Sequence, residues 1–132
     1  MKLNRSEWAA PSFIIPKKDG QVRFISDFRR LNKQVKRTPY TIPHIEYMIN
    51  SLSNFNYASA LDLIMGYYNI FLTDAAKKVC TITTPFRKYK YNCLPMGVCV
   101  APDIFQEQMS ALIENLGFFR FYLDNLIIIK LG

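Results

Sequence analysis

Short apolar runs separated by polar or proline-containing turns cover most of this chain. Runs that alternate with polar residues, or that are bounded by Pro, Gly, Asn and Asp, are typical of strands. An Asp-Gly pair at positions 19 and 20 supplies the backbone freedom that a first hairpin turn needs. The pattern predicts strands at residues 11–16, 21–28, 56–63, 69–72, 79–83, 89–94, 121–123 and 126–129.

Two segments have helical spacing instead. Residues 43–52 carry apolar side chains at that spacing, with Thr41 as the expected cap and Pro43 in the first turn. Residues 101–116 carry a longer stripe that ends at Gly117, and we expect this stripe to lie in the core. Its members are Ile104, Phe105, Gln108, Met109, Leu112 and Ile113. With a polar turn expected at residues 74–78, the pattern predicts an α+β fold.

Two acidic residues lie at the ends of apolar strands. Asp124 and Asn125 separate the last two apolar runs, and both residue types tolerate the positive φ of a hairpin turn. Asp62 lies near the end of an earlier run, with no basic residue nearby in sequence. If these strands pair antiparallel on one sheet backed by the long helix, the carboxylates meet and offer oxygen ligands to a divalent metal. The alternatives are a solvated turn at Asp124 and a helix N-cap at Asp62.

Composition and charge narrow the class of protein. The chain has 132 residues, half of them hydrophobic, which fits one ordered domain with a core. Its net charge is +7, and residues 17–37 hold eight basic residues against two acidic ones. Such a cluster favours a polyanionic partner, because each neutralised phosphate releases condensed counterions. The alternative is a solvated basic face.

The remaining reactive side chains give weaker signals. Cys80, Cys93 and Cys99 match no zinc spacing, and we expect buried, reduced thiols. His44 has no second ligand at metal-binding spacing, so we expect it on the surface. No run approaches the roughly 18 apolar residues of a membrane span, and the first residues lack the apolar core of a signal peptide. We therefore expect no membrane partner.

A series of short motifs occurs in a fixed order along the chain. They are Trp8-Ala-Ala-Pro11, Pro16-Lys-Lys-Asp-Gly20, Asp27-Phe-Arg-Arg-Leu-Asn32, Tyr40-Thr-Ile-Pro43, Leu61-Asp-Leu63, Gly66-Tyr-Tyr68, Leu94-Pro-Met-Gly97, Ala101-Pro102, Phe105-Gln106 and Tyr122-Leu-Asp-Asn125. In order and spacing they resemble the reverse transcriptases of gypsy-like long-terminal-repeat retrotransposons. The resemblance implies the fingers and palm of a right-hand polymerase, with an antiparallel palm sheet backed by helices. Fingers would span about residues 6–43 and 70–94, and palm about residues 44–69 and 95–132.

The resemblance also implies an activity and its residues. Asp62 and Asp124 match the carboxylates of two-metal phosphoryl transfer, and the Leu63 carbonyl would be a further ligand to Mg²⁺ or Mn²⁺. The substrates would be deoxynucleoside triphosphates and an RNA or DNA template with its primer. Residues that match contacts to the nucleotide, including Tyr67 as an aromatic gate beneath the sugar, are Lys17, Lys18, Arg23, Tyr67 and Met96. The basic residues expected to bind nucleic acid are Arg29, Arg30, Lys33, Lys36 and Arg37.

The chain departs from the family pattern in two ways. Asn125 stands where the family carries a second acid in the turn, and a unit charge pair about 4 Å apart is worth about 4 kcal/mol at an effective dielectric of about 20. We therefore expect a loss of rate on the order of a thousandfold or more. The chain also ends at Gly132, so we expect the thumb, ribonuclease H and integrase regions of a parent polyprotein to be missing.

Three interpretations of the function follow. The first is an impaired RNA-directed DNA polymerase, which we would expect in the cytoplasm within a retroelement particle. The second is a remnant that binds nucleic acid without catalysis, and the third is a degenerate retroelement copy with no activity.

Overall fold

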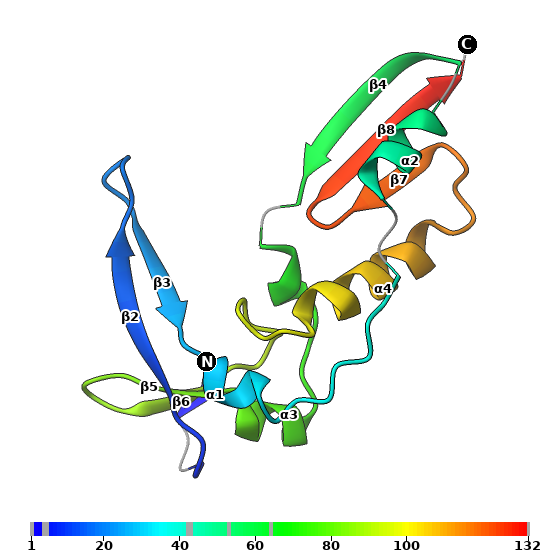
Figure 1. The fold of residues 1–132 in the computed structure, drawn as a ribbon. Helices are drawn as coiled ribbons and strands as arrows, with labels where there is room; N and C mark the ends of the chain where they lie inside the picture. Colours follow the sequence, from blue (N-terminus) through cyan, green and yellow to red (C-terminus); the bar gives the residue numbers. More distant parts are fainter. Residues whose placement is uncertain (1, 4–5, 42–43, 53, 64, 132) are drawn as a thin grey trace. The chain divides into compact units, whose positions relative to one another are not determined.

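The chain folds as two compact units, each with its own sheet (Figure 1). The computed structural model describes residues 2–3, 6–41, 44–52, 54–63 and 65–131. Unit 1 comprises Met1–Arg37 and Tyr67–Ala101, and unit 2 comprises Thr38–Gly66 and Pro102–Gly132. The α+β composition predicted from the sequence is present.

Unit 1 is built on a mixed sheet with the strand order β1-β6-β5-β2-β3. Strands β2 and β3 form an antiparallel hairpin that projects from the rest of the unit (Figure 1), and β2 pairs with β5 in parallel. The buried residues Phe28, Ile82 and Tyr91 form part of its core, where the rings of Phe28 and Tyr91 lie 6.0 Å apart. Its elements are β1 (Lys2–Leu3), β2 (Ala10–Pro16), β3 (Val22–Ser26), α1 (Arg29–Asn32), α3 (Asp74–Val79), β5 (Thr81–Thr83) and β6 (Lys88–Lys90).

Unit 2 holds an antiparallel sheet with the order β4-β8-β7. Helix α4 packs on it through Phe105, whose ring meets that of Phe121 edge-on at 5.6 Å. A hollow of about 290 Å³ lined by residues of α2, α4 and β7 lies within this unit. The elements are α2 (Ile45–Asn50), β4 (Phe55–Asp62), α4 (Ala101–Ile113), β7 (Phe119–Tyr122) and β8 (Asn125–Leu131), with the 3-10 helix η1 (Gly66–Asn69) at the boundary between the units.

Two local predictions in the middle of the chain are wrong. Residues 69–72 do not form a strand, because η1 extends to Asn69 and the segment then makes a single bridge between Phe71 and Cys93. Residues 74–78 are helical rather than a turn. The hydroxyl of Thr73 accepts a hydrogen bond from the backbone N–H of Ala76 (3.3 Å), which caps the first turn of α3.

The predicted helices are shorter and less buried than expected. The N-cap of α2 is the exposed His44 rather than Thr41, and Pro43 lies outside the described residues. In α4 the predicted apolar stripe is only partly buried, because Leu112 is 71% exposed and Gln108 is also exposed. The buried positions of this helix are Ala101, Asp103, Phe105 and Gln106.

Burial of the cysteines also differs from the prediction, and one strand is exposed along its whole length. Every residue of β4 is exposed, since β4 lies at the edge of its sheet. Cys80, Cys93 and Cys99 are free, but only Cys80 is buried, and this burial raises the pKa of its thiol to about 11. Among the described residues, no helix is long and apolar enough to cross a membrane.

Candidate metal and nucleotide site

The two acid-bearing strands of unit 2 meet at one end of their sheet. Strands β4 and β8 pair antiparallel, and this register places Asp62 opposite Asn125. Beyond the last strand pair, the backbone N–H of Leu63 donates to the carbonyl of Asp124 (2.8 Å). The pairing predicted from the sequence is therefore present, and it brings Asp62, Leu63, Asp124 and Asn125 together. Because η1 begins only at Gly66, Asp62 ends a strand and does not cap a helix.

The turn that carries Asp124 differs from the predicted one. Tyr122 pairs with Asn125, so the two connecting residues are Leu123 and Asp124, and Asn125 already belongs to β8. The positive φ falls on Leu123 (51°), not on Asp124 or Asn125. A left-handed backbone costs a residue with a Cβ about 1–2 kcal/mol, so contacts from outside the turn must stabilise it.

The outside contact comes from the buried carboxamide of Gln106. Its Oε1 accepts a hydrogen bond from the backbone N–H of Leu123 (3.1 Å), and its Nε2 donates to the carbonyl of Phe121 (3.3 Å). The side chain is only 2% exposed, which excludes water as a competing partner. Sequence reasoning noted Gln106 within a motif but gave it no role. No clear signal was available in the sequence, because Gln106 opens the polar run Gln106-Glu107-Gln108 and nothing in that run marks which amide is buried.

The carboxylates of Asp62 and Asp124 have no ion-pair or hydrogen-bond partner among the described residues. Asp62 is exposed and Asp124 is half-buried. Their carboxylates, the Asn125 amide and the Leu63 carbonyl are all oxygen donors, the ligand type that a hard divalent cation such as Mg²⁺ prefers. The described residues contain no group of three or more Asp, Glu, His or Cys side chains that could hold a metal. This end of the sheet therefore offers a cation two carboxylates, those of Asp62 and Asp124, and the amide oxygen of Asn125.

Asp27 in unit 1 shows the opposite environment. It follows β3, and the guanidinium of Arg29 binds both of its oxygens, the shortest N···O distance being 2.6 Å. Hydrogen bonds from the Arg29 side chain and backbone lower the pKa of Asp27 to about 2. This carboxylate is already paired with a cation and is unsuited to hold a metal.

The cations that match triphosphate contacts lie on the β2–β3 hairpin. Lys17 and Lys18 are exposed at its turn, and Arg23 is exposed on β3 opposite Ile15. The turn is closed by its own backbone, since the N–H of Lys17 donates to the carbonyl of Gln21 (2.7 Å) and Gly20 has a φ of 81°. These cations are therefore presented to solvent by a local structure.

The other residues that match nucleotide contacts also lie in unit 1. Met96 is half exposed in the loop before α4, and the side chain of Asn32 braces that loop. Its Nδ2 donates to the Gly97 carbonyl and its Oδ1 accepts from the Cys99 N–H, both at 2.9 Å. Tyr67 is half-buried in η1. The basic residues on α1 and in the segment after it are Arg29, Arg30, Lys33, Lys36 and Arg37, all exposed.

Comparison with known proteins matches this chain to one protein family. The family model described as reverse transcriptase (RNA-dependent DNA polymerase) matches residues 15–130. The chain is 27% identical to the retrovirus-related Pol polyprotein from transposon 412 of Drosophila melanogaster, covering 94% of this chain and 11% of that protein. It is 31% identical to a putative enzymatic polyprotein of Cassava vein mosaic virus, covering 92% of this chain and 20% of that protein.

A gypsy polyprotein also matches the chain, and a solved structure has the same fold. The chain is 28% identical to the Pol polyprotein from transposon gypsy of Drosophila melanogaster, covering 97% of this chain and 13% of that protein. The crystal structure of the prototype foamy virus protease-reverse transcriptase matches with a TM-score of 0.88 at 22% identity, covering 99% of this chain and 18% of that one. The chain thus spans no more than a fifth of any of these relatives.

Proposed function

Because this chain belongs to the reverse transcriptase (RNA-dependent DNA polymerase) family and has its fingers-and-palm fold, we propose that it carries a weakened site for deoxynucleotide transfer to a primer 3′-hydroxyl. In this proposal the fingers are about residues 6–43 and 70–94, most of which lie in unit 1. The palm is about residues 44–69 and 95–132, most of which lie in unit 2. The observation that supports it best is the pairing of β4 with β8, which brings Asp62 and Asp124 together without a basic partner among the described residues.

The site residues have distinct roles in this proposal. Asp62, Asp124 and the Leu63 carbonyl would hold Mg²⁺, or Mn²⁺ in its place. When bound, these ions stabilise charge on the attacking 3′-oxygen and on the leaving pyrophosphate. Gln106 and the Leu63 N–H keep the turn in place, so the carboxylate of Asp124 is oriented before substrate arrives.

The cations of unit 1 would contact the substrates. Lys17 or Lys18, with Arg23, would neutralise the triphosphate where the transition state spreads negative charge. Tyr67 would close the site beneath the sugar and exclude a ribose 2′-hydroxyl, and Met96 would line the nucleotide pocket. The basic residues on and after α1 would bind the template with its primer. This charge makes binding sensitive to salt, because it depends on counterion release.

Asn125 is the reason for a weakened site. An amide oxygen still coordinates a cation but carries no full charge, so the site has one negative charge fewer for its metal ions. At about 4 kcal/mol for a unit pair near 4 Å, the loss corresponds to roughly a thousandfold in rate. A chain that binds nucleic acid without transfer is the second candidate, because its exposed basic residues do not depend on Asn125.

Primer extension on an RNA template tests the proposal. Residues 1–132 replace the matching segment of a relative's polymerase, and Asn125→Asp is compared with the natural sequence in Mg²⁺ and in Mn²⁺. We expect Asn125→Asp to raise the extension rate about a thousandfold. In that background Asp62→Asn should remove the gain, whereas Glu107→Gln, which neutralises an exposed acid of α4, should not.

The outcomes separate the two candidates. No extension by Asn125→Asp, in a chimera that still binds template and primer, would contradict the polymerase proposal and favour binding without catalysis. Equal and substantial extension by both forms would contradict the role given to Asn125.

A further inference from the structure

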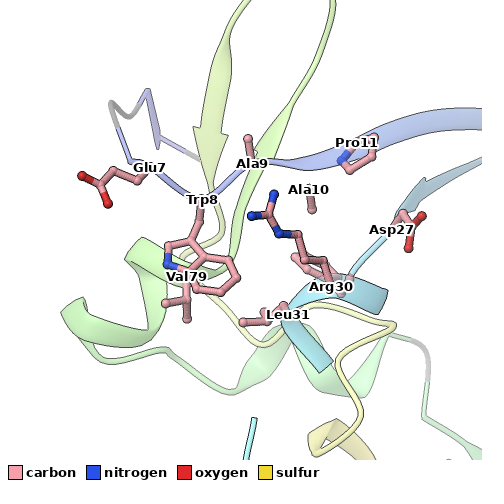
Figure 2. A pocket seen from close by; sticks show the side chains of 10 residues that line it. Glu7, Trp8, Ala9, Ala10, Pro11, Asp27, Arg30, Leu31 and Val79 are labelled. Atoms are coloured by element: carbon pink, nitrogen blue, oxygen red, sulfur yellow. The ribbon is translucent and has the colours of Figure 1, made fainter. Parts of the chain in front are cut away.

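Unit 1 contains a cavity of about 570 Å³ beside the base of the β2–β3 hairpin (Figure 2). Its volume falls within the range of about 300–1,000 Å³ that is typical of small-molecule sites. Seven of the ten described residues that line it are apolar, and the other three are Glu7, Asp27 and Arg30. The cavity therefore combines an apolar wall with a few charged groups.

The apolar wall includes the indole of Trp8, whose backbone is fixed by hydrogen bonds. The hydroxyl of Ser6 accepts a hydrogen bond from the Trp8 backbone N–H (3.1 Å) and donates to the carbonyl of Lys78 at the end of α3 (2.7 Å). Figure 2 shows the indole beside Val79, with Leu31 of α1 next to it. Because Leu31 is buried and the Trp8 backbone is tied to α3 through Ser6, the segment that carries the indole is held in place before any ligand binds.

The guanidinium of Arg30 is the available cation of this cavity. It lies between Trp8 and Asp27 in Figure 2, and it has no hydrogen-bond or ion-pair partner among the described residues. Asp27 does not neutralise it, because both oxygens of Asp27 are bound by Arg29. The carboxylate of Glu7 points away from Arg30 (Figure 2). An aromatic face beside an unpaired guanidinium suits a planar ring that carries a negative group.

We propose that this cavity binds one unpaired base of a single-stranded nucleic acid, stacked on Trp8, with the adjoining phosphate at Arg30. Every base has a π-face that an aromatic side chain accepts, so such a site tolerates any sequence. The excess of basic residues at positions 17–37 would hold the strand nearby. The inference rests on the proposed function, in which the template is the strand that supplies the base.

Trp8 is the only tryptophan of the chain, so its fluorescence reports on this cavity alone. The chain is titrated with a single-stranded RNA of about twelve nucleotides, a length within the site sizes of about 4–16 nucleotides known for OB-fold domains. Anisotropy of a dye on the RNA measures total binding in parallel. We expect quenching of Trp8 that saturates together with the anisotropy. An abasic strand of equal length, which keeps the phosphates, should bind without quenching.

Two variants test the contacts. By anisotropy, Trp8→Leu should weaken binding about tenfold, since stacking of one base contributes about 1–3 kcal/mol. Arg30→Gln should weaken binding and reduce the quenching at saturation. Arg87→Gln removes the same charge from an exposed turn outside the cavity lining, and it should leave the quenching at saturation unchanged.

The possible results separate this proposal from the proposed function. Binding by anisotropy with unchanged Trp8 fluorescence would overturn the cavity proposal and leave nucleic-acid binding intact. Equal quenching by the abasic strand would also overturn it, because phosphate alone would then suffice. Absence of binding by anisotropy would contradict both. Quenching by an unstructured peptide but not by RNA would assign the cavity to a protein segment and overturn the base proposal.

Discussion

The two hairpins that carry the predicted site residues differ in what holds their turns. The turn between β2 and β3 is closed by its own backbone and by Asp19, whose Oδ1 accepts from the Gln21 N–H (3.1 Å), and its left-handed residue is Gly20. The turn between β7 and β8 is held from outside by Gln106, and its left-handed residue is Leu123. One turn is therefore local and relaxed, whereas the other depends on tertiary contacts.

This difference matches the roles proposed for the two turns. Lysines that contact a flexible triphosphate must extend towards it, but they need no exact position. An exposed hairpin tip leaves their long side chains free to do so. A carboxylate that holds a metal must be placed to within a fraction of an ångström, which favours a turn fixed by buried hydrogen bonds. The strained φ of Leu123 is one cost of that placement.

The largest expected effect comes from Gln106→Met, which keeps the size of the side chain and removes both hydrogen bonds. The Leu123 N–H and the Phe121 carbonyl would then lack their partner in a buried place, so the free energy of unfolding should fall by about 2 kcal/mol. In the active Asn125→Asp background, the kcat for extension should fall about tenfold or more with little change in the KM for template and primer. Urea unfolding and steady-state kinetics measure these two effects.

Gln108→Met is the matched control, because Gln108 lies on the same helix and is exposed. It should change the free energy of unfolding by less than about 0.5 kcal/mol. Hydrogen exchange at the Leu123 amide should become faster only in Gln106→Met. If exchange and kcat are the same in both variants, Gln106 does not hold the turn.

The local features of the first hairpin could be predicted from the sequence, but those of the second could not. Asp19 and Gly20 form a turn by their own chemistry, which acts within a few residues. In the second turn, Asp124 and Asn125 have the right local propensity, yet the left-handed φ falls on Leu123 because Gln106, far away in sequence, bonds that residue. Tertiary hydrogen bonds of this kind leave no periodic signal.

Pairing and burial were predictable to different degrees. The antiparallel pairing of β4 with β8 followed from two apolar runs that each end in an acid, and it is confirmed. The exposure of β4 was not predictable, because an apolar run gives no sign of whether its strand lies at the edge of a sheet. Helix α3 was missed because its only strong start signal, the cap at Thr73, precedes a segment too short to show a period. The roles of the site residues stay predictions.

A smaller effect should follow Gly20→Ala, which tests whether the first turn is local. At Gly20 an added Cβ meets nothing within 4 Å, so its cost is the left-handed φ of 81° alone, about 1 kcal/mol. Exchange of the Lys17 amide, which closes this turn, should become about fivefold faster. Exchange of the Leu123 amide should not change.

Gly117→Ala is the matched control for this change. Its added Cβ also meets nothing within 4 Å, but Gly117 has no positive φ. The substitution should be neutral or stabilise the chain by about 0.5 kcal/mol through the unfolded state. An equal loss of stability in both alanine variants would show that the backbone angle of Gly20 does not matter.

The smallest effect concerns the carboxylates rather than the turns. Arg29 lowers the pKa of Asp27 to about 2, so this ion pair contributes stability above the ordinary pKa of 3.8 and loses it as the pH falls through about 2. Arg29→Gln should therefore raise the Asp27 midpoint towards 3.8, as measured from its carboxyl ¹³C resonance. Arg87→Gln, with the same loss of charge, should leave the midpoint unchanged.

The same resonances extend the comparison to the candidate metal site. Mn²⁺ at neutral pH should broaden the carboxyl signals of Asp62 and Asp124, which have no cationic partner among the described residues. Mn²⁺ should leave the carboxyl signal of Asp27 sharp, because both oxygens of Asp27 already accept hydrogen bonds from Arg29. Broadening of Asp27 to the same degree would show that the metal binds any exposed acid. The pairing of β4 with β8 would then not be what selects the site.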